Sequence, residues 1–246
     1  MSDPVDFPQY LAFINHQLRP NATAVLSPDR NARWRGITIS RQSGTGAHLV
    51  AEQITRILQN CAPQGTASWM LFDRNLLERV LTDHQLPARL AKYMPEDRIS
   101  GIEDTLDELF GLHPPTWKLV EKTSDTILRL AELGNVILLG RGANVVTSKL
   151  GYMFHVRLVG AREERIEFVQ KDRNVDHKTA TEIVDHEDEG RRRYVKRYFH
   201  RDVNDPALYH LVINTTELGH VMAARLVADT ILTDTSTPHT AHAAHG

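Results

Sequence analysis

Cysteine is almost absent from this 246-residue sequence, in which Cys61 is the single thiol. A lone cysteine excludes a disulfide framework and a cysteine-based metal cluster, and it favours a reducing compartment. Long apolar runs are also missing, since no window reaches the roughly 18 to 20 residues that a membrane span needs. The first 18 residues carry acids where a secretory signal would carry bases. We therefore expect a cytoplasmic protein that does not engage a membrane.

The sequence also lacks an excess of positive charge, because its formal net charge at neutral pH is -2. A domain that grips the phosphate backbone of a nucleic acid usually carries a strongly basic balance, so we expect no nucleic-acid partner. The hydrophobic share of 41% and the charged share of 24% are typical of an ordinary globular protein with a sizeable core. Composition does not fix the oligomeric state.

Apolar runs alternate with helical stretches from residue 36 onwards, which is the pattern of a parallel sheet covered by helices on both faces. We predict a three-layer α/β domain over residues 36–233 with a five-stranded parallel sheet. Its strands are expected at residues 36–39, 69–72, 136–139, 154–159 and 211–213.

Four other segments have their own signatures. Residues 1–35 are predicted to form an N-terminal helix and a linker, and residues 234–246 form a tail with too little apolar content to fold. A helical insert at 95–134 is expected to roof a substrate pocket. A highly charged helix at 176–201 is expected to act as a lid.

The segment 37–54, ITISRQSGTGAHLVAEQI, places a glycine-containing loop between an apolar strand and an amphipathic helix. Backbone N–H groups in such a loop can converge on an anion, and the helix N-terminus adds a favourable dipole. The P-loop formula would require a lysine at Ala47, so the usual point charge is missing. We predict nucleotide phosphate binding by Arg41, Gln42, Ser43, Gly44, Thr45, Gly46, Ala47 and His48.

If phosphoryl transfer occurs at this loop, another cation must replace the lysine. Arg41 stands two residues before Ser43 and is our candidate, because a guanidinium offers a planar fork of donors. The alternative is that Ser43 to Gly46 form only a tight connection, and that His48 is only a surface residue of the helix.

Charged residues follow two more of the predicted strands, at the edge of an open sheet where ligands bind. Asp73 and Arg79 follow the second strand, where they could meet a phosphate or a sugar, or serve only as a helix cap and a surface residue. Arg141 follows the third strand between Gly140 and Gly142, which would allow close approach of the backbone. These residues are candidates for substrate binding.

The stretch DHEDEGRRRYVKRYFHRD, within the predicted lid helix, sets acids four residues before bases. Such spacing stabilises a solvated helix through its own ion pairs. The predicted pairs are Glu187 with Arg191, Asp188 with Arg192 and Glu189 with Arg193. Lys196, Arg197 and Arg201 have no such acid, and a basic helix of this kind could close over transferred phosphates.

Over residues 36–232 the chain resembles the cytidylate kinase-like family of P-loop proteins in six motifs taken together. The motifs are ITISRQSGTGAHLVAEQI, LFDRNLLERVL, GRGANVV, HVRLVGAREERIEFV, GRRRYVKRYF and DPALYHLVINTTEL. The resemblance implies ATP and Mg2+ as cofactors, with no protein metal ligand assigned. It places acceptor-binding roles on Asp73 and Arg79 and a phosphate-binding role on Arg141. Gly142 replaces the aspartate of the family's Gly-Arg-Asp motif. The lid arginines fall within residues 191–197, where we assign Arg191 to the substrate and Arg193 and Arg197, with Arg41, to catalysis.

Two functions follow from this set of residues. The first is ATP-dependent phosphoryl transfer to a nucleoside monophosphate such as CMP, in which positioning and electrostatics carry the catalysis. The alternative is a binding module, derived from a kinase, that holds a nucleotide or another phosphorylated ligand without turnover. Loss of the lysine favours the module, and the retained arginines favour a phosphate ligand in both.

Overall fold

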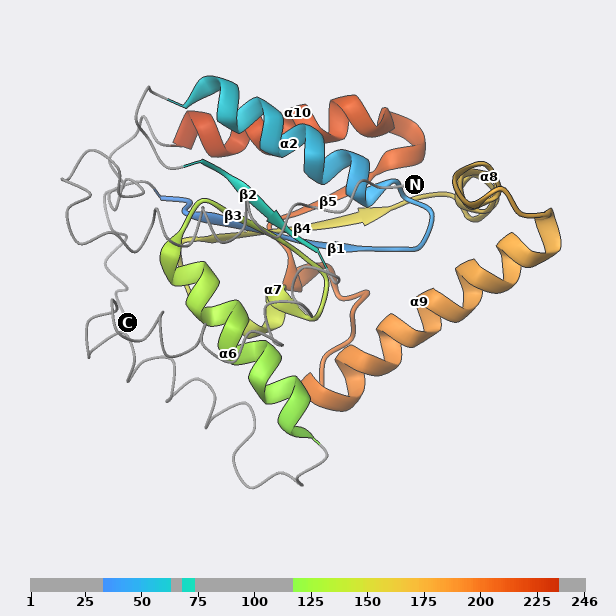
Figure 1. Ribbon diagram of the computed structural model, residues 1–246, viewed down its shortest axis with the longest axis horizontal. Coiled ribbons are helices and arrows are strands. Elements are labelled where there is room, and N and C mark those ends of the chain that lie inside the picture. Colours follow the sequence, from blue (N-terminus) through green and yellow to red (C-terminus); the bar gives the residue numbers. More distant parts are fainter. Residues whose placement is uncertain (1–32, 63–67, 74–116, 235–246) are drawn as a thin grey trace.

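Five parallel strands form the centre of the computed structural model, which describes residues 33–62, 68–73 and 117–234 (Figure 1). The strand order is β2-β3-β1-β4-β5, which makes β1 the middle strand between β3 and β4. The predicted fold class is confirmed, and every predicted strand is found within two residues of its bounds. The strands are β1 (Gly36–Arg41), β2 (Met70–Phe72), β3 (Val136–Leu139), β4 (Met153–Val159) and β5 (Leu211–Asn214).

One face of the sheet is covered by α2 (Ala47–Cys61) and α10 (Thr215–Asp234), which lie side by side above it in Figure 1. Helix α2 presents Val50, Ile54 and Leu58 to the sheet at helical spacing, and all three are fully buried. Helix α10 contributes small residues such as Ala224 and Val227, which allow the two helices to pack closely. This layer fixes the start of α2 directly above the end of β1.

The other face is covered by α6 (Lys118–Leu133), the short helix α7 (Ala143–Val146) and the C-terminal end of α9 (His177–Phe199). Helix α6 buries Ile127, Leu128 and Leu130 against the sheet. Helix α6, the last part of the insert predicted at residues 95–134, thus belongs to the core of the domain. Residues 95–116 lie outside the described residues, as do the N-terminal residues 1–32 and the tail from residue 235 onwards.

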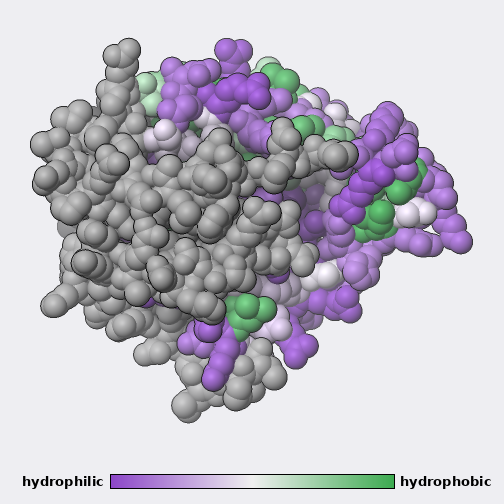
Figure 2. All heavy atoms as spheres, viewed as in Figure 1, coloured by the Kyte–Doolittle hydropathy of each residue, from purple (hydrophilic) through white to green (hydrophobic). Residues whose placement is uncertain are grey.

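Helices α8 (Arg162–Arg173) and α9 form a pair that projects beyond the carboxyl ends of β1 and β4 (Figure 1). The pair has a small core of its own, made of Ile166, Val169, Ala180 and Val184. Its outer surface, at the right in Figure 2, is largely hydrophilic. A one-turn helix, η2 (Pro206–Leu208), then leads into β5. None of the described helices is long and apolar enough to cross a bilayer.

Candidate phosphate-binding site

The carboxyl ends of β1 and β3 bring two of the predicted arginines together. Strands β1 and β3 are parallel neighbours, with Ile39 in register with Leu139. Arg41 ends β1, and Arg141 follows β3 by two residues, so both side chains are delivered to the same edge of the sheet. In open α/β sheets this edge is where ligands bind.

Gly140 explains how the two arginines share this small space. It adopts a φ of +88°, and a Cβ atom at this position would lie 1.8 Å from Nη1 of Arg41. The missing side chain thus leaves room for the Arg41 guanidinium. Arg141 itself has a left-handed φ of 55°, which is unusual for a residue with a side chain. The glycines predicted to allow close approach do so, and at Gly140 the approaching group is Arg41.

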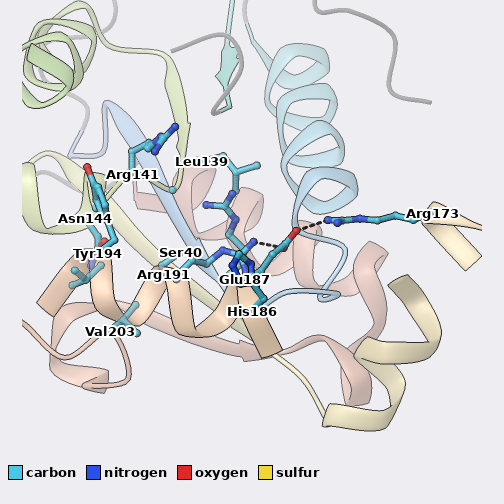
Figure 3. A pocket seen from close by; sticks show the side chains of 15 residues that line it. Ser40, Leu139, Arg141, Asn144, Arg173, His186, Glu187, Arg191, Tyr194 and Val203 are labelled. Atoms are coloured by element: carbon cyan, nitrogen blue, oxygen red, sulfur yellow. Dashed lines mark hydrogen bonds and ion pairs between the residues drawn. The ribbon is translucent and has the colours of Figure 1, made fainter. Parts of the chain in front are cut away.

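A cavity of about 500 Å³ lies over this edge, between the sheet and α9. Figure 3 shows Arg141 on the strand side of it and Arg191 on the helix side, next to Glu187. Its volume is in the range typical of small-ligand sites. The cavity is lined by Ser40, Arg41, Leu139, Gly140, Arg141, Gly142, Asn144, Arg173, His186, Glu187, Gly190, Arg191, Tyr194, Val195 and Val203.

The Arg41 guanidinium is the least compensated charge of the cavity. Among the described residues, none donates to it, accepts from it or forms an ion pair with it. Burial, followed by the nearby charges of Arg191 and Arg141, lowers the pKa of Arg41 from 12.5 to about 10, although Glu187 and Asp73 act in the opposite direction. Three cations converge on one partly buried volume, which favours an anionic ligand there.

Tyr194 adds a polar group to the same wall. Burial raises the pKa of its hydroxyl to about 12, although the neighbouring charge of Arg141 acts in the opposite direction. The hydroxyl therefore stays protonated at neutral pH and can donate a hydrogen bond to a ligand oxygen.

The loop from Gln42 to Gly46 has the tight shape that the sequence predicts. Thr45 Oγ1 donates to the carbonyl oxygen of Gln42 at 2.9 Å, and Gln42 Oε1 accepts from the amide of Gly160 at 3.0 Å. Gly44 has a φ of +76°, and a Cβ atom there would meet the carbonyl oxygen of Arg165 at 2.2 Å. Among the described residues, no side chain caps α2 at Gly46. The helix N-terminus is left with the electrostatic character of an anion site.

Side chains of α9 fill this loop. The amide of Ser43 donates to Asp188 Oδ1 at 2.6 Å, and the Ser43 hydroxyl donates to Glu187 Oε2 at 2.7 Å. The bases of this helix were expected to close over transferred phosphates, whereas the side chains that bond to Ser43 are its acids. Burial alone would raise the pKa of Glu187, yet hydrogen bonds from Ser43, Arg173 and Arg191 outweigh it and lower the pKa to about 2. Both carboxylates therefore occupy a position that suits phosphate oxygens.

Three arginines that the sequence analysis did not assign contribute to this region. Arg165 is buried and donates to the carbonyl oxygen of Ser43 at 2.8 Å and to Asp188 Oδ2 at 2.6 Å. Arg173 donates to Glu187 Oε1 at 2.7 Å. Arg165 lies in the motif HVRLVGAREERIEFV, but a base among charged neighbours on a helix reads as a surface residue. Only the packing of α8 on the loop shows its position.

Arg157 is the third unassigned arginine, and it is buried in the middle of β4. Its guanidinium donates to Ser40 Oγ at 2.9 Å and to Asn204 Oδ1 at 2.8 Å. It lines a smaller cavity of about 180 Å³ that shares Arg41 and Arg191 with the larger one. The positive region thus extends from β3 across β1 to β4.

The remaining predicted residues fall into three groups. Asp73 follows β2 close enough to influence Arg41, while Arg79 lies outside the described residues. Ala47 is buried at the start of α2, and His48 lies on the helix surface with Nε2 3.1 Å from Glu52 Oε1. Arg193 and Arg197 are exposed on α9 and do not line either cavity. Arg193 Nε lies 3.7 Å from Glu189 Oε1, and the Arg197 guanidinium lies over the ring of Tyr198.

Of the predicted ion pairs in α9, two are found. Arg191 Nη2 lies 2.7 Å from Glu187 Oε2, and the Glu189–Arg193 pair is present at 3.7 Å. Asp188 pairs with Arg165 and Arg191 instead of Arg192, because it points toward the loop. Arg192 pairs with Glu189.

The chemistry of the donors fits a phosphate-bearing ligand better than a metal ion held by protein alone. In the described part of the chain, no group of three or more histidine, cysteine or acidic side chains could hold a metal. Mg2+ at phosphoryl-transfer sites is held largely by substrate phosphates and one or two carboxylates, so this finding does not bear on it. In the loop, the Ser43 amide and hydroxyl already donate to Asp188 and Glu187.

A family model and the crystal structure of one protein of 21% identity support the same fold. The family model of the cytidylate kinase-like family matches residues 36–217. A crystal structure of an uncharacterized protein from Eubacterium ventriosum ATCC 27560 superposes with a TM-score of 0.63 at 21% identity, covering 80% of this chain and 98% of that one. The crystal structure of TT1252 from Thermus thermophilus has a TM-score of 0.38 at 12% identity, covering 83% of this chain and all of that one. No curated protein matches the sequence.

Proposed function

The chain belongs to the cytidylate kinase-like family, and from this premise we propose that it transfers a phosphoryl group from ATP, with Mg2+, to a nucleoside monophosphate. CMP or a similar pyrimidine nucleotide is the acceptor that the resemblance favours. The acceptor phosphate would lie in the 500 Å³ cavity, against Arg41, Arg141 and Arg191. Membership of the family supports a kinase-related fold and a nucleotide ligand, and the identity of the acceptor is our proposal.

The observation that carries the proposal is the Arg41 guanidinium, which has no hydrogen-bond or ion-pair partner among the described residues although Arg141 and Arg191 are close to it. Bringing three cations together in a partly buried space costs free energy. A dianionic phosphate would remove this cost and accept several charge-assisted hydrogen bonds. The donor fork of each guanidinium also matches the geometry of phosphate oxygens.

Two other residues would orient the acceptor. The Tyr194 hydroxyl, which remains protonated, can donate to a phosphate or ribose oxygen. Asp73 at the end of β2 is the carboxylate that could accept hydrogen bonds from the sugar hydroxyls. Arg79, which lies outside the described residues, is also proposed to position the acceptor. In this mechanism the chain's residues hold and orient the reactants, since phosphoryl transfer depends mostly on positioning and electrostatics.

A second function is favoured by one observation, the bond between the Ser43 amide and Asp188. Because Asp188 occupies the Ser43 amide and Ala47 replaces the P-loop lysine, the protein could hold a nucleotide without turnover. The nucleotide would lie in the 500 Å³ cavity lined by Arg41, Arg141 and Arg191, called the arginine cavity below. Such a binding module would use the same acceptor site. Arg193 and Arg197, which are exposed on α9, would then have no catalytic role.

Binding and turnover are tested separately. Calorimetric titration with CMP is expected to show saturable binding, and cytidine, which lacks the phosphate, is expected to bind at least about a hundredfold more weakly. A coupled assay of ADP release with ATP, Mg2+ and each nucleoside monophosphate then distinguishes the two functions. CMP-dependent ADP release supports the kinase, and CMP binding without ADP release supports the module.

Two variants control for the general charge of the protein. Arg191→Met is expected to weaken CMP binding at least tenfold, because Arg191 lines the cavity. Arg162→Met removes the same charge from the exposed side of α8, where Arg162 pairs with Asp185, and is expected to bind CMP like the native chain. Equal affinities for CMP and cytidine would refute the proposed site.

A further inference from the structure

The loop after β1 is bonded to two carboxylates of the same chain. Asp188 Oδ1 accepts from the Ser43 amide at 2.6 Å, and Glu187 Oε2 accepts from the Ser43 hydroxyl at 2.7 Å. Both acids come from the middle of α9, more than 140 residues further along the chain. Their oxygens lie at the mouth of α2, whose N-terminus favours negative charge.

Three guanidinium groups donate to the same carboxylates, Arg165 and Arg173 to the oxygens that face away from Ser43 and Arg191 to the two oxygens that also accept from Ser43. Arg165 donates to Asp188 at 2.6 Å, and Arg173 donates to Glu187 at 2.7 Å. Arg191 donates to both, at 2.7 Å to Glu187 and at 3.1 Å to Asp188. An amide, a hydroxyl and three guanidiniums around anionic oxygens are the partners that a polyphosphate recruits at such a loop.

We propose that Glu187 and Asp188 are an internal competitor for the polyphosphate site at Ser43 to Gly46. A bound triphosphate replaces their oxygens, and Arg165, Arg173 and Arg191 change partner from carboxylate to phosphate. This inference rests on the proposed function, whose donor site it concerns. In this proposal Arg165, Arg173 and Arg191 supply the positive charge that the loop lacks at Ala47.

The contacts of α9 permit this exchange. Its buried residues are Ala180 and Val184 near one end and Val195 and Phe199 near the other. Between Val184 and Val195 no described side chain is fully buried, and Tyr194, next to Val195, is the residue of this stretch that packs against the main core cluster. Glu187 and Asp188 have side chains that are 27% and 26% exposed, so they can rotate away without opening an apolar interface.

The loop and Arg165 are held in place by close packing, so the exchange requires movement of Glu187 and Asp188 only. Gly44 packs so closely on the backbone of Arg165 that a Cβ atom would lie 2.2 Å from its carbonyl oxygen. The Arg165 side chain is 8% exposed and also donates to the carbonyl oxygens of Ser43 and Gly160. Arg165 thus stays at the loop when Asp188 leaves and can donate to the incoming anion.

The test uses inorganic tripolyphosphate as the probe and the double variant Glu187→Gln with Asp188→Asn. Calorimetry is expected to show that this variant binds tripolyphosphate at least tenfold more tightly than the native chain, since no charged competitor must be displaced. The control pairs Asp185→Asn with Glu189→Gln, which changes the net charge equally on the same helix. Neither residue bonds to the loop, so its affinity is expected within threefold of native.

A second measurement on the native chain applies even if the double variant is poorly folded. The amide proton of Ser43, resolved by NMR, is expected to shift on addition of tripolyphosphate, because its acceptor changes from Asp188 to a phosphate oxygen. An unchanged Ser43 signal at saturation contradicts the proposal that Glu187 and Asp188 compete with the ligand. Equal tripolyphosphate affinities of the native chain and a folded double variant contradict it as well. Absence of tripolyphosphate binding in every variant also overturns it. CMP titration in parallel distinguishes that result from failure of the proposed function, since the acceptor cavity does not include Ser43.

Discussion

Replacing Arg41 by methionine is predicted to stabilise the protein while weakening its ligand binding. The reason is that the folded chain holds this guanidinium beside Arg141 and Arg191 with no ion-pair partner among the described residues. Methionine has a similar length and no charge, so it removes the repulsion and the burial of charge while filling the same space.

The magnitude follows from the lowered pKa of Arg41. A change from 12.5 to about 10 corresponds to about 3 kcal/mol of cost for the charged form in the folded state. Because the folded pKa lies below the unfolded pKa, this cost is fully present at every pH below about 10 and disappears only as the pH rises toward 12.5. The side chain keeps some contact with solvent, so we expect Arg41→Met to gain about 1 to 3 kcal/mol at neutral pH.

Denaturant unfolding with and without CMP measures both effects. Without ligand, the midpoint of Arg41→Met is expected to exceed that of the native chain. With CMP at a hundred times its dissociation constant, the native chain gains about 2.7 kcal/mol and the variant gains much less. Arg165→Met is the matched control, because Arg165 is buried but hydrogen-bonded, and its loss should destabilise the fold. A variant of Arg41 that is less stable than native and binds CMP normally would refute the reasoning.

Three further changes test other parts of the structure. Gly140→Ala places a methyl group 1.8 Å from Nη1 of Arg41 at a φ of +88°, so we expect a loss of about 1 to 3 kcal/mol in unfolding free energy and weaker CMP binding by calorimetry. Burial and the nearby His210 lower the pKa of His155 from 6.5 to about 4, so the free energy of unfolding should fall by up to about 3 kcal/mol as the pH drops from 6.5 to 4. In His155→Asn, denaturant unfolding should show a flatter dependence of stability on pH over this range. Gly44→Ala, whose methyl group would meet a backbone oxygen of α8 at 2.2 Å, should lower the melting temperature measured by calorimetry and shift the amide signals of α8.

Much of the fold is readable from sequence because it depends on local pattern. The alternation of apolar runs and amphipathic stretches specifies the strands, and the edge at which β1 and β3 end brings Arg41 and Arg141 together. The glycines around Arg141 also gave a usable signal, since a positive φ at Gly140 is a local requirement.

What the sequence does not show is the direction in which a charged helix faces. Helix α9 carries both acids and bases, and either set could face the loop when only spacing is known. Asp188 and Glu187 face Ser43 because Arg165 and Arg173, on a different helix, pair with them from outside. This choice depends on long-range packing, so no local pattern predicts it.

The place of helix α6 in the core is hard to predict for a related reason. Its buried stripe of Ile127, Leu128 and Leu130 is present in the sequence, but an amphipathic helix can cover either a sheet or a ligand pocket. Its contact with Phe72 and Leu138 in one core cluster identifies it as part of the fold.

The most direct test of the arginine cavity is the phosphorus NMR signal of CMP bound to the native chain, followed as a function of pH. Free phosphomonoesters lose their second proton with a pKa near 6. Held by Arg41, Arg141 and Arg191, the bound phosphate is predicted to remain a dianion, with this pKa lowered by at least about one unit. A bound signal that titrates like free CMP, or no bound signal at all, would contradict the account.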